Sequence, residues 1–211
     1  MTEMLLRADG VDLPATLDVP EDAAGVIVFA HGSGSSRLSP RNVVVATYLR
    51  ETGRLGTLLF DLLTPGEDAF YENRFDIELL TRRLVAACRW VVAREGQERM
   101  PLGLFGASTG AAAALKASVA IPDLVSAVVS RGGRPDLATG ALPLVAVPTL
   151  LIVGGADYQV LEMNRKAQAM MPVGMARLEV VPGATHLFEE PGALEEVARL
   201  TRDFFTEMLE A

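Results

Sequence analysis

Cysteine is nearly absent from this chain of 211 residues, in which Cys88 is the only one. An internal disulfide is therefore excluded, and such a chain suits a reducing compartment. Cys88 stands within the apolar helical pattern RRLVAACRWVVA, so we expect a buried structural thiol rather than a reactive one. Aromatic residues make up only 6% of the chain, so we expect a core built mainly from Ala, Val and Leu.

Long apolar runs and positive charge are also scarce. No uncharged apolar run approaches the roughly 18 residues of a membrane span. The N-terminal segment carries Glu3 and Arg7 and lacks the apolar core of a signal peptide, so we expect a soluble, cytoplasmic protein. Lysine and arginine number 19 against 27 aspartates and glutamates, and this net charge of -8 disfavours a nucleic-acid partner.

The pattern of elements predicts an α/β fold. There is no internal repeat or low-complexity linker, and the length suits a single domain over residues 1–211. Strands are predicted at 4–8, 14–20, 25–30, 55–61, 101–107, 124–130, 147–155 and 176–183, and helices at 41–53, 75–95, 109–120, 161–171 and 193–209. This alternation predicts a mostly parallel central sheet with helices on both faces, whose functional groups gather at the carboxyl edge of the strands.

The segment Gly106-Ala107-Ser108-Thr109-Gly110 joins a predicted strand to a predicted helix and fits the G-x-S-x-G nucleophile elbow. A nucleophile that stands clear of a sheet needs a strained turn. Glycines two residues before and after it remove side chains that would collide there. The following helix adds free N–H groups and a positive dipole end. The alternative is an ordinary glycine-rich turn in which the serine is incidental.

Only two histidines, His31 and His186, can act as the base that a serine hydroxyl needs. His186, in VVPGATHLFEEPG, follows the last predicted strand, where a loop can carry the imidazole over the sheet edge. We therefore favour His186. His31 opens the glycine-rich segment HGSGSS, and we interpret it as a structural residue that braces the backbone.

An acid must hold the imidazole tautomer and stabilise its charged form. Asp157, in LLIVGGADYQV, follows a buried strand and lies between the serine and the histidine, in the order Ser–Asp–His. Asp136, in RGGRPDLA, is the rival candidate. We interpret Asp61, in LLFDLLT, as a structural carboxylate that binds loop N–H groups.

The segment HGSGSSR, from His31 to Arg37, is a candidate oxyanion-binding loop. Acyl transfer generates an oxyanion, which preorganised backbone N–H groups stabilise. We expect these donors to be the amides of Ser33 and Thr109, with Gly32 allowing the loop to turn tightly. A phosphate cradle is the alternative, but the loop has no Walker lysine, and Arg37 replaces the last glycine of G-x-G-x-x-G.

Residues that bind substrate are harder to derive. Arg131 ends a predicted strand beside the expected site, and Arg134 or Arg37 could approach it; a guanidinium there could bind a substrate carboxylate. A loop-stabilising salt bridge is the alternative for these arginines.

The candidate substrate-binding residues are Gly32, Arg131 and Tyr158, although Tyr158 could instead have only a packing role. The segments 62–75 and 131–147 are the only sizeable candidates for a lid over the site. Because so little of the chain is left for a lid, we expect an open cleft for small acyl groups.

The segments HGSGSS, GASTG, GGADYQV and GATHLFEEPG, in this order, resemble the α/β-hydrolase superfamily and within it the dienelactone-hydrolase-like branch, which has no large cap domain. Dienelactone hydrolases proper have a cysteine at the elbow, where this chain has Ser108; the difference favours a serine carboxylic-ester hydrolase.

The resemblance implies particular roles. Ser108 would be the nucleophile, His186 the general base and then acid, and Asp157 the orienting carboxylate; the amides of Ser33 and Thr109 would form the oxyanion hole. It implies a small ester or lactone as substrate and no metal or organic cofactor. That neither nucleic acid nor membrane is a partner is expected from the negative charge and the lack of a long apolar run. A non-catalytic binding protein of the same fold, or an acyltransferase, thioesterase or peptidase with the same triad, remain alternatives.

Overall fold

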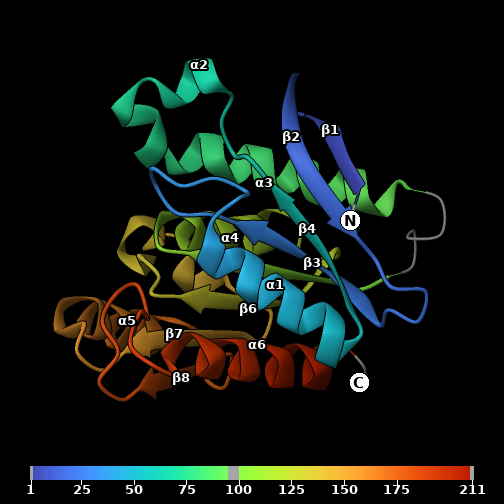
Figure 1. The fold of residues 1–211 in the computed structure, drawn as a ribbon. Helices are drawn as coiled ribbons and strands as arrows, with labels where there is room; N and C mark the ends of the chain where they lie inside the picture. Colours follow the sequence, from blue (N-terminus) through green and yellow to red (C-terminus); the bar gives the residue numbers. More distant parts are fainter. Residues whose placement is uncertain (1, 95–99, 210–211) are drawn as a thin grey trace.

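A sheet of eight strands forms the centre of the protein, here a computed structural model that describes residues 2–94 and 100–209 (Figure 1). The strands are β1 (Thr2–Ala8), β2 (Val11–Asp18), β3 (Gly25–Ala30), β4 (Leu55–Phe60), β5 (Leu102–Ala107), β6 (Val125–Arg131), β7 (Thr149–Gly154) and β8 (Ala176–Val181). Their order is β1-β2-β4-β3-β5-β6-β7-β8. Only the β1–β2 and β2–β4 pairs are antiparallel, which confirms the mostly parallel sheet predicted from the sequence.

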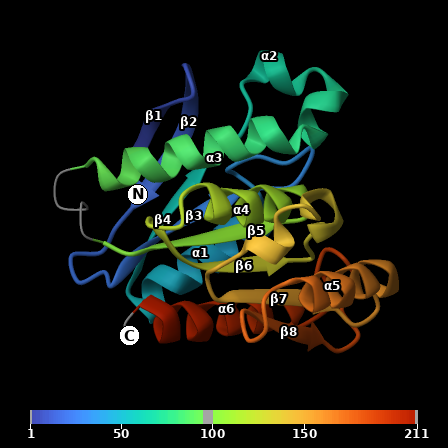
Figure 2. The same ribbon diagram turned by 180° about the vertical axis from the view of Figure 1, so that it is seen from behind.

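Helices cover both faces of this sheet. The helices α1 (Pro40–Gly53) and α6 (Ala193–Leu209) pack on one face (Figure 1), while α3 (Ile77–Val92), α4 (Thr109–Ala120) and α5 (Tyr158–Met170) lie on the other (Figure 2). The strands β3, β4, β5 and β7 are buried along their whole length, as expected for parallel strands enclosed on both faces.

Small side chains bring the helices close to the sheet. The run Ala111–Ala114 of α4 is completely buried, and so is Cys88 of α3. Burial raises the pKa of the Cys88 thiol to about 12, so Cys88 is a structural thiol, as predicted. The alanine run of α4 fixes the start of that helix, and therefore Ser108, directly above the end of β5.

The connections contain short elements that the sequence pattern did not predict. Between β4 and α3 lie α2 (Pro65–Asp68) and the 3-10 turn η1 (Tyr71–Phe75). A capping box joins Thr64 and Glu67 at the start of α2. Two further 3-10 turns, η2 (Pro135–Ala138) and η3 (Leu142–Leu144), follow β6.

The helix predicted at 75–95 is observed as α3, and its expected end at residue 95 lies outside the described residues.

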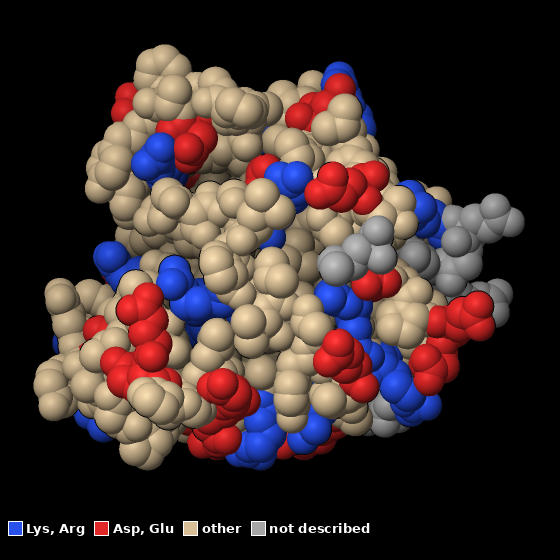
Figure 3. All heavy atoms as spheres, in the orientation of Figure 1, with Lys and Arg blue, Asp and Glu red and all other residues tan. Residues whose placement is uncertain are grey.

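Charged side chains of both signs are interspersed over the face that carries α1 and α6 (Figure 3). Many of them pair on the surface, as Arg199 does with Glu196 and Asp203, and Arg177 with Glu207. Within residues 2–94 and 100–209, none of the helices has both the length and the apolar character that crossing a bilayer requires.

Candidate active site

Ser108 occupies a strained turn between β5 and α4. Its backbone φ is +52° and its ψ is -119°, a region that residues other than glycine rarely adopt. Hydrogen bonds hold this conformation from both sides. The Ser108 N–H donates to the Arg131 carbonyl at 3.2 Å, and the Ser108 carbonyl accepts from the amides of Ala111 and Arg134 at 3.1 Å each. The surrounding backbone therefore fixes Ser108 in the geometry expected of a nucleophile elbow.

Two glycines make this turn possible. A Cβ atom on Gly106 would lie 2.4 Å from the Cα of Ala111, and one on Gly110 would lie 2.2 Å from the Ala30 carbonyl oxygen. Neither neighbour can move, because both are backbone atoms. Gly32, in the loop after β3, lies against the elbow from the other side, and a Cβ there would meet the Ser108 Cβ at 3.1 Å. The spacing of these glycines thus has a steric cause.

His186 and Asp157 meet at the same edge of the sheet. His186 Nδ1 lies 2.7 Å from Asp157 Oδ2, a contact in which the ring N–H donates to the carboxylate. Backbone hydrogen bonds tie their two loops together, from Gly155 N–H to the Val181 carbonyl at 2.8 Å and from Ala156 N–H to the Ala184 carbonyl at 2.9 Å. The Asp157 side chain is 14% exposed and that of His186 is 39% exposed, so the imidazole faces solvent while its carboxylate partner is covered.

The other candidate carboxylates have different partners. Asp136 accepts two hydrogen bonds from Arg134, at 2.8 and 2.7 Å. Asp61 accepts from the Arg37 backbone N–H at 2.7 Å and from its guanidinium at 3.1 Å. The structure therefore brings Asp157, and not Asp136, to His186, and it gives Asp61 the loop-binding position inferred from the sequence.

Ser108 and His186 line one cavity of about 260 Å³, which we call the nucleophile cavity. Its walls are Gly32, Ser33, Ser35, Ser39, Arg41, Asn42, Ala107, Ser108, Arg131, His186 and Leu187. Among the described residues, no hydrogen bond joins the Ser108 hydroxyl to the His186 ring. Catalytic hydrogen bonds commonly tighten only when substrate binds. The expected contact between Ser108 and His186 Nε2 therefore stays a prediction.

His31 is built into the loop as a brace. Its ring Nδ1 donates to the Gly32 carbonyl at 3.0 Å, and its Nε2 accepts from the Leu62 N–H at 3.0 Å. These two bonds require the neutral ring. Burial lowers the pKa of His31 and favours the same form. With both nitrogens occupied, His31 orients the loop that carries Gly32 and Ser33, which agrees with the structural interpretation of this residue.

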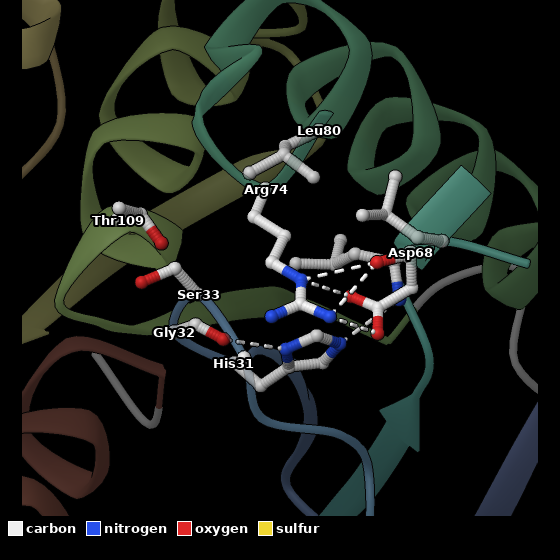
Figure 4. A pocket seen from close by; sticks show the side chains of 10 residues that line it. His31, Gly32, Ser33, Asp68, Arg74, Leu80 and Thr109 are labelled. Carbon is white, nitrogen blue, oxygen red and sulfur yellow. Dashed lines mark hydrogen bonds and ion pairs between the residues drawn. The ribbon is translucent and has the colours of Figure 1, made fainter. Parts of the chain in front are cut away.

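Ser33 and Thr109 come from two neighbouring segments, the loop after β3 and the start of α4 (Figure 4). Both line a second, much smaller cavity of about 10 Å³, enough for one water molecule. Asp68 and Arg74 close this small cavity through an ion pair with a 2.9 Å separation. Ser33 also lines the nucleophile cavity, whereas Thr109 is not part of its wall, and the role of the two amides as oxyanion donors stays a prediction.

The candidate substrate-binding residues divide into two groups. Gly32 and Arg131 line the nucleophile cavity. Tyr158, the first residue of α5, is 77% exposed and is not part of the cavity wall, so the structure does not bring it to the site. Arg37 and Arg134 form the ion pairs with Asp61 and Asp136, which matches the salt-bridge alternative for these two arginines.

The sequence analysis missed the contribution of α1. Ser39, Arg41 and Asn42, at the start of this helix, line the nucleophile cavity. A signal was present, because Pro40 is a typical first helical residue, and a helix that follows β3 must begin at the same sheet edge as the elbow. In the described parts of the chain, no group of three or more His, Cys, Asp or Glu side chains is arranged to hold a metal ion.

Comparison with solved structures identifies close likenesses. A dienelactone hydrolase from Anabaena variabilis shares 48% sequence identity with this chain, at a TM-score of 0.93 over 98% of this chain and 97% of that one. Est1E from Butyrivibrio proteoclasticus shares 17% identity at a TM-score of 0.82 over 99% of each chain, which is a likeness of fold. No protein-family model matches the chain.

Two curated proteins from strains of Mycobacterium tuberculosis are 55% identical to this chain over 207 residues. Each bears the name "Putative phosphoribosyl transferase". The matched region covers 98% of this chain and 46% of each mycobacterial protein, so the chain spans about half the length of the curated relatives it matches.

Proposed function

The chain belongs to the dienelactone-hydrolase-like branch of the α/β-hydrolase superfamily, and on this basis we propose that it is a serine hydrolase that cleaves small carboxylic esters or lactones through an acyl-Ser108 intermediate. One observation carries the proposal. Ser108 stands at positive φ in the same cavity as His186, and the Nδ1 of His186 is held 2.7 Å from Asp157. A serine hydroxyl is activated at neutral pH when a histidine oriented by a carboxylate accepts its proton, and the contact between His186 and Asp157 supports this role for the two residues.

In the first half of the reaction, His186 Nε2 takes the proton of Ser108 as its oxygen attacks the acyl carbon. Asp157 stabilises the imidazolium that forms and keeps the proton of Nδ1 directed toward itself. The amides of Ser33 and Thr109 stabilise the oxyanion of the tetrahedral intermediate. His186 then protonates the leaving alcohol, the bond from carbon to the alcohol oxygen breaks, and the acyl group remains on Ser108.

The second half repeats these steps with water. His186 removes a proton from a water molecule that attacks the acyl carbon, and the bond to Ser108 breaks as the proton returns to the serine oxygen. The 39% exposure of the His186 side chain supports this step, because water can reach the base without a conformational change. A lactone follows the same path, except that the leaving alcohol stays attached to the acyl group.

Other functions of the same fold are less well supported. A non-catalytic binding protein would have no need for both the strained Ser108 and the hydrogen bond from His186 to Asp157. Acyl transfer to an alcohol or amine, or cleavage of a thioester or peptide, requires the same residues and differs only in the substrate. We do not propose phosphoribosyl transfer for this chain, because the mycobacterial proteins with that name contain about as much sequence again outside the matched region.

Labelling with a fluorophosphonate probe tests the proposal. The oxygen of an activated serine displaces fluoride from the probe and becomes phosphonylated, so the wild-type protein should be labelled, Ser108→Ala should not be, and His186→Ala should be labelled much more slowly. Circular dichroism confirms that each variant is folded. Absence of labelling in a folded wild-type protein would refute the proposed function, and labelling of Ser108→Ala would show that another residue is the nucleophile.

A further inference from the structure

Asn164 of α5 is a buried amide that the proposed mechanism does not use. Its side chain is completely buried. The Nδ2 group donates to the Gly133 carbonyl at 3.0 Å and to the Val160 carbonyl at 2.8 Å, whereas Oδ1 is buried and has no hydrogen-bond partner among the described residues. A buried polar atom without a partner lowers the stability of the folded protein. A leucine of similar size would avoid this cost, so the two donated bonds call for an explanation.

The two bonds of Asn164 differ in what they connect. The bond to Val160 stays within α5, because it joins residues four positions apart on one helix. The bond to Gly133 joins α5 to the segment that follows β6. We call residues 131–134, at the end of β6 and directly after it, the bridging loop. Both acceptors of Nδ2 are carbonyl oxygens, which fixes the orientation of the amide with its nitrogen toward this loop.

The bridging loop holds Ser108 through both of its backbone groups. The Arg131 carbonyl accepts from the Ser108 N–H at 3.2 Å, and the Arg134 N–H donates to the Ser108 carbonyl at 3.1 Å. These two bonds stabilise the strained backbone of the nucleophile, whose φ is +52°. A displacement of the bridging loop would therefore displace Ser108.

The same loop lies next to His186. Gly132 is buried, and a Cβ atom built on it would lie 3.5 Å from both Nδ1 and Cε1 of the His186 ring. Its N–H donates to the Ile152 carbonyl of β7 at 2.8 Å. The bridging loop therefore borders both the nucleophile and its base, and its position sets how the two residues face each other.

Two glycines leave the bridging loop without side chains of its own to fix this position. Gly132 has a φ of +52°, a conformation that the missing Cβ atom makes accessible. At Gly133 a Cβ would lie 2.8 Å from the Ala111 Cβ and would collide with the Ser130 hydroxyl oxygen, so a larger residue cannot replace it. A side-chain anchor must therefore come from a neighbouring element, and Asn164 supplies one through the Gly133 carbonyl.

Asn164 also shares its helix with the proposed acid of the triad. Asp157 is the N-cap of α5, and its carbonyl accepts from the Leu161 N–H at 2.9 Å. Asn164 follows about two helical turns later. One helix therefore carries both the carboxylate that contacts His186 and the amide that holds the bridging loop.

We propose that Asn164 is a positioning residue, which sets the distance and orientation of Ser108 relative to His186 by anchoring the bridging loop to α5. The inference rests on the proposed function, because it concerns the alignment of the two residues between which the proton moves. It also accounts for the buried amide, whose bond to Gly133 serves alignment and not only stability. A misplacement of about 1 Å caused by a change outside the reacting groups can slow an enzyme about 100-fold.

A role in stability alone is the competing explanation. Loss of a buried hydrogen bond destabilises a protein whether or not the bond lies near a catalytic group. Gln168 provides a matched comparison on the same helix. Its Nε2 donates to the Ala176 carbonyl at 3.1 Å, where β8 begins, at the edge of the sheet away from the active site. Gln168→Met and Asn164→Leu each remove an amide bond from α5 to a backbone carbonyl, but only Asn164→Leu changes the bridging loop.

The test measures hydrolysis of 4-nitrophenyl butanoate, labelling by a fluorophosphonate probe and the melting temperature of each variant. In Asn164→Leu, kcat should fall about 10- to 100-fold while KM changes less than about threefold, because alignment and not substrate binding is lost. The rate constant of labelling should fall by a similar factor, since the probe reports attack by the Ser108 oxygen. Gln168→Met should keep kcat and the labelling rate within about twofold of the wild type, even where its melting temperature falls as much.

Asn164→Ser keeps the test valid if Asn164→Leu does not fold. A serine hydroxyl within a helix donates to the carbonyl four residues before it, so this variant retains a bond to Val160 but is too short to reach Gly133. Its kcat should fall in the same range as that of Asn164→Leu, with KM again nearly unchanged.

The wild-type protein separates the inference from the proposed function. If it hydrolyses the ester and is labelled, but folded Asn164 variants retain kcat within about threefold, the inference is wrong while the proposed function stands. If Gln168→Met loses as much kcat as Asn164→Leu, stability alone explains the amide and the inference is overturned. If the wild-type protein neither hydrolyses an ester nor reacts with the probe, the proposed function fails and the positioning role fails with it.

Discussion

Replacing Ser108 with alanine is expected to lower kcat for a neutral 4-nitrophenyl ester by about 10⁴- to 10⁶-fold, the range found when a triad nucleophile is removed. Without the hydroxyl no acyl-enzyme can form, and only substrate binding and the oxyanion donors remain to assist attack by water. The fold should persist, because the elbow is held by backbone hydrogen bonds and alanine adds no atoms to it. Initial rates at saturating ester measure the effect.

The matched control for this variant is Ser126→Ala on β6, which removes a serine hydroxyl that is not part of the cavity wall. Its kcat should stay within about twofold of the wild-type value. A loss of less than tenfold in Ser108→Ala, with the protein folded, would mean that Ser108 is not the nucleophile and that the strained turn has another purpose.

Replacing Asp157 with asparagine is expected to lower kcat by about 10⁴-fold, as found when the triad carboxylate becomes an amide. The shape of the side chain is retained, but the amide cannot stabilise the imidazolium of His186 and favours the wrong tautomer of its ring. Substrate binding does not depend on this charge, so KM should change little. Steady-state kinetics of the neutral ester separate the two parameters.

Asp136→Asn is the matched control for the acid. Asp136 is the rival carboxylate by sequence, but it is paired with Arg134 rather than with His186. Its replacement should therefore leave kcat within a few-fold of the wild type. A large loss in Asp136→Asn together with a small one in Asp157→Asn would contradict the assignment of the acid.

Much of the fold and of the candidate site follows from local sequence patterns. The continuous apolar runs of β3, β4, β5 and β7 indicated strands buried on both faces, and they are buried along their whole length. The glycines around Ser108 indicated a crowded turn, and each one faces backbone atoms that exclude a Cβ. Chain order favoured Asp157 over Asp136, and in the structure the carboxylate that contacts His186 is that of Asp157.

Features that depend on how elements face one another could not be derived in this way. A sequence does not give the rotation of α1 about its axis, so the approach of Arg41 and Asn42 to the cavity was not foreseen. The same limit applies to Tyr158, which follows Asp157 directly but points to solvent from the first turn of α5. The pairs Arg37–Asp61 and Arg134–Asp136 likewise depend on side-chain directions. The short helix α2 did carry a signal, because Thr64 and Glu67 have the spacing of a capping box.

The central claim is that an acyl group is transferred to Ser108, and mass spectrometry of the trapped intermediate tests this claim most directly. The protein is mixed with a 4-nitrophenyl ester, quenched in acid within the first turnover, and analysed intact and after proteolysis. The account predicts a mass increase equal to the acyl group, located on the peptide that contains Ser108 and absent from Ser108→Ala. Rapid release of 4-nitrophenol without any covalent adduct, or an adduct on another residue, would contradict it.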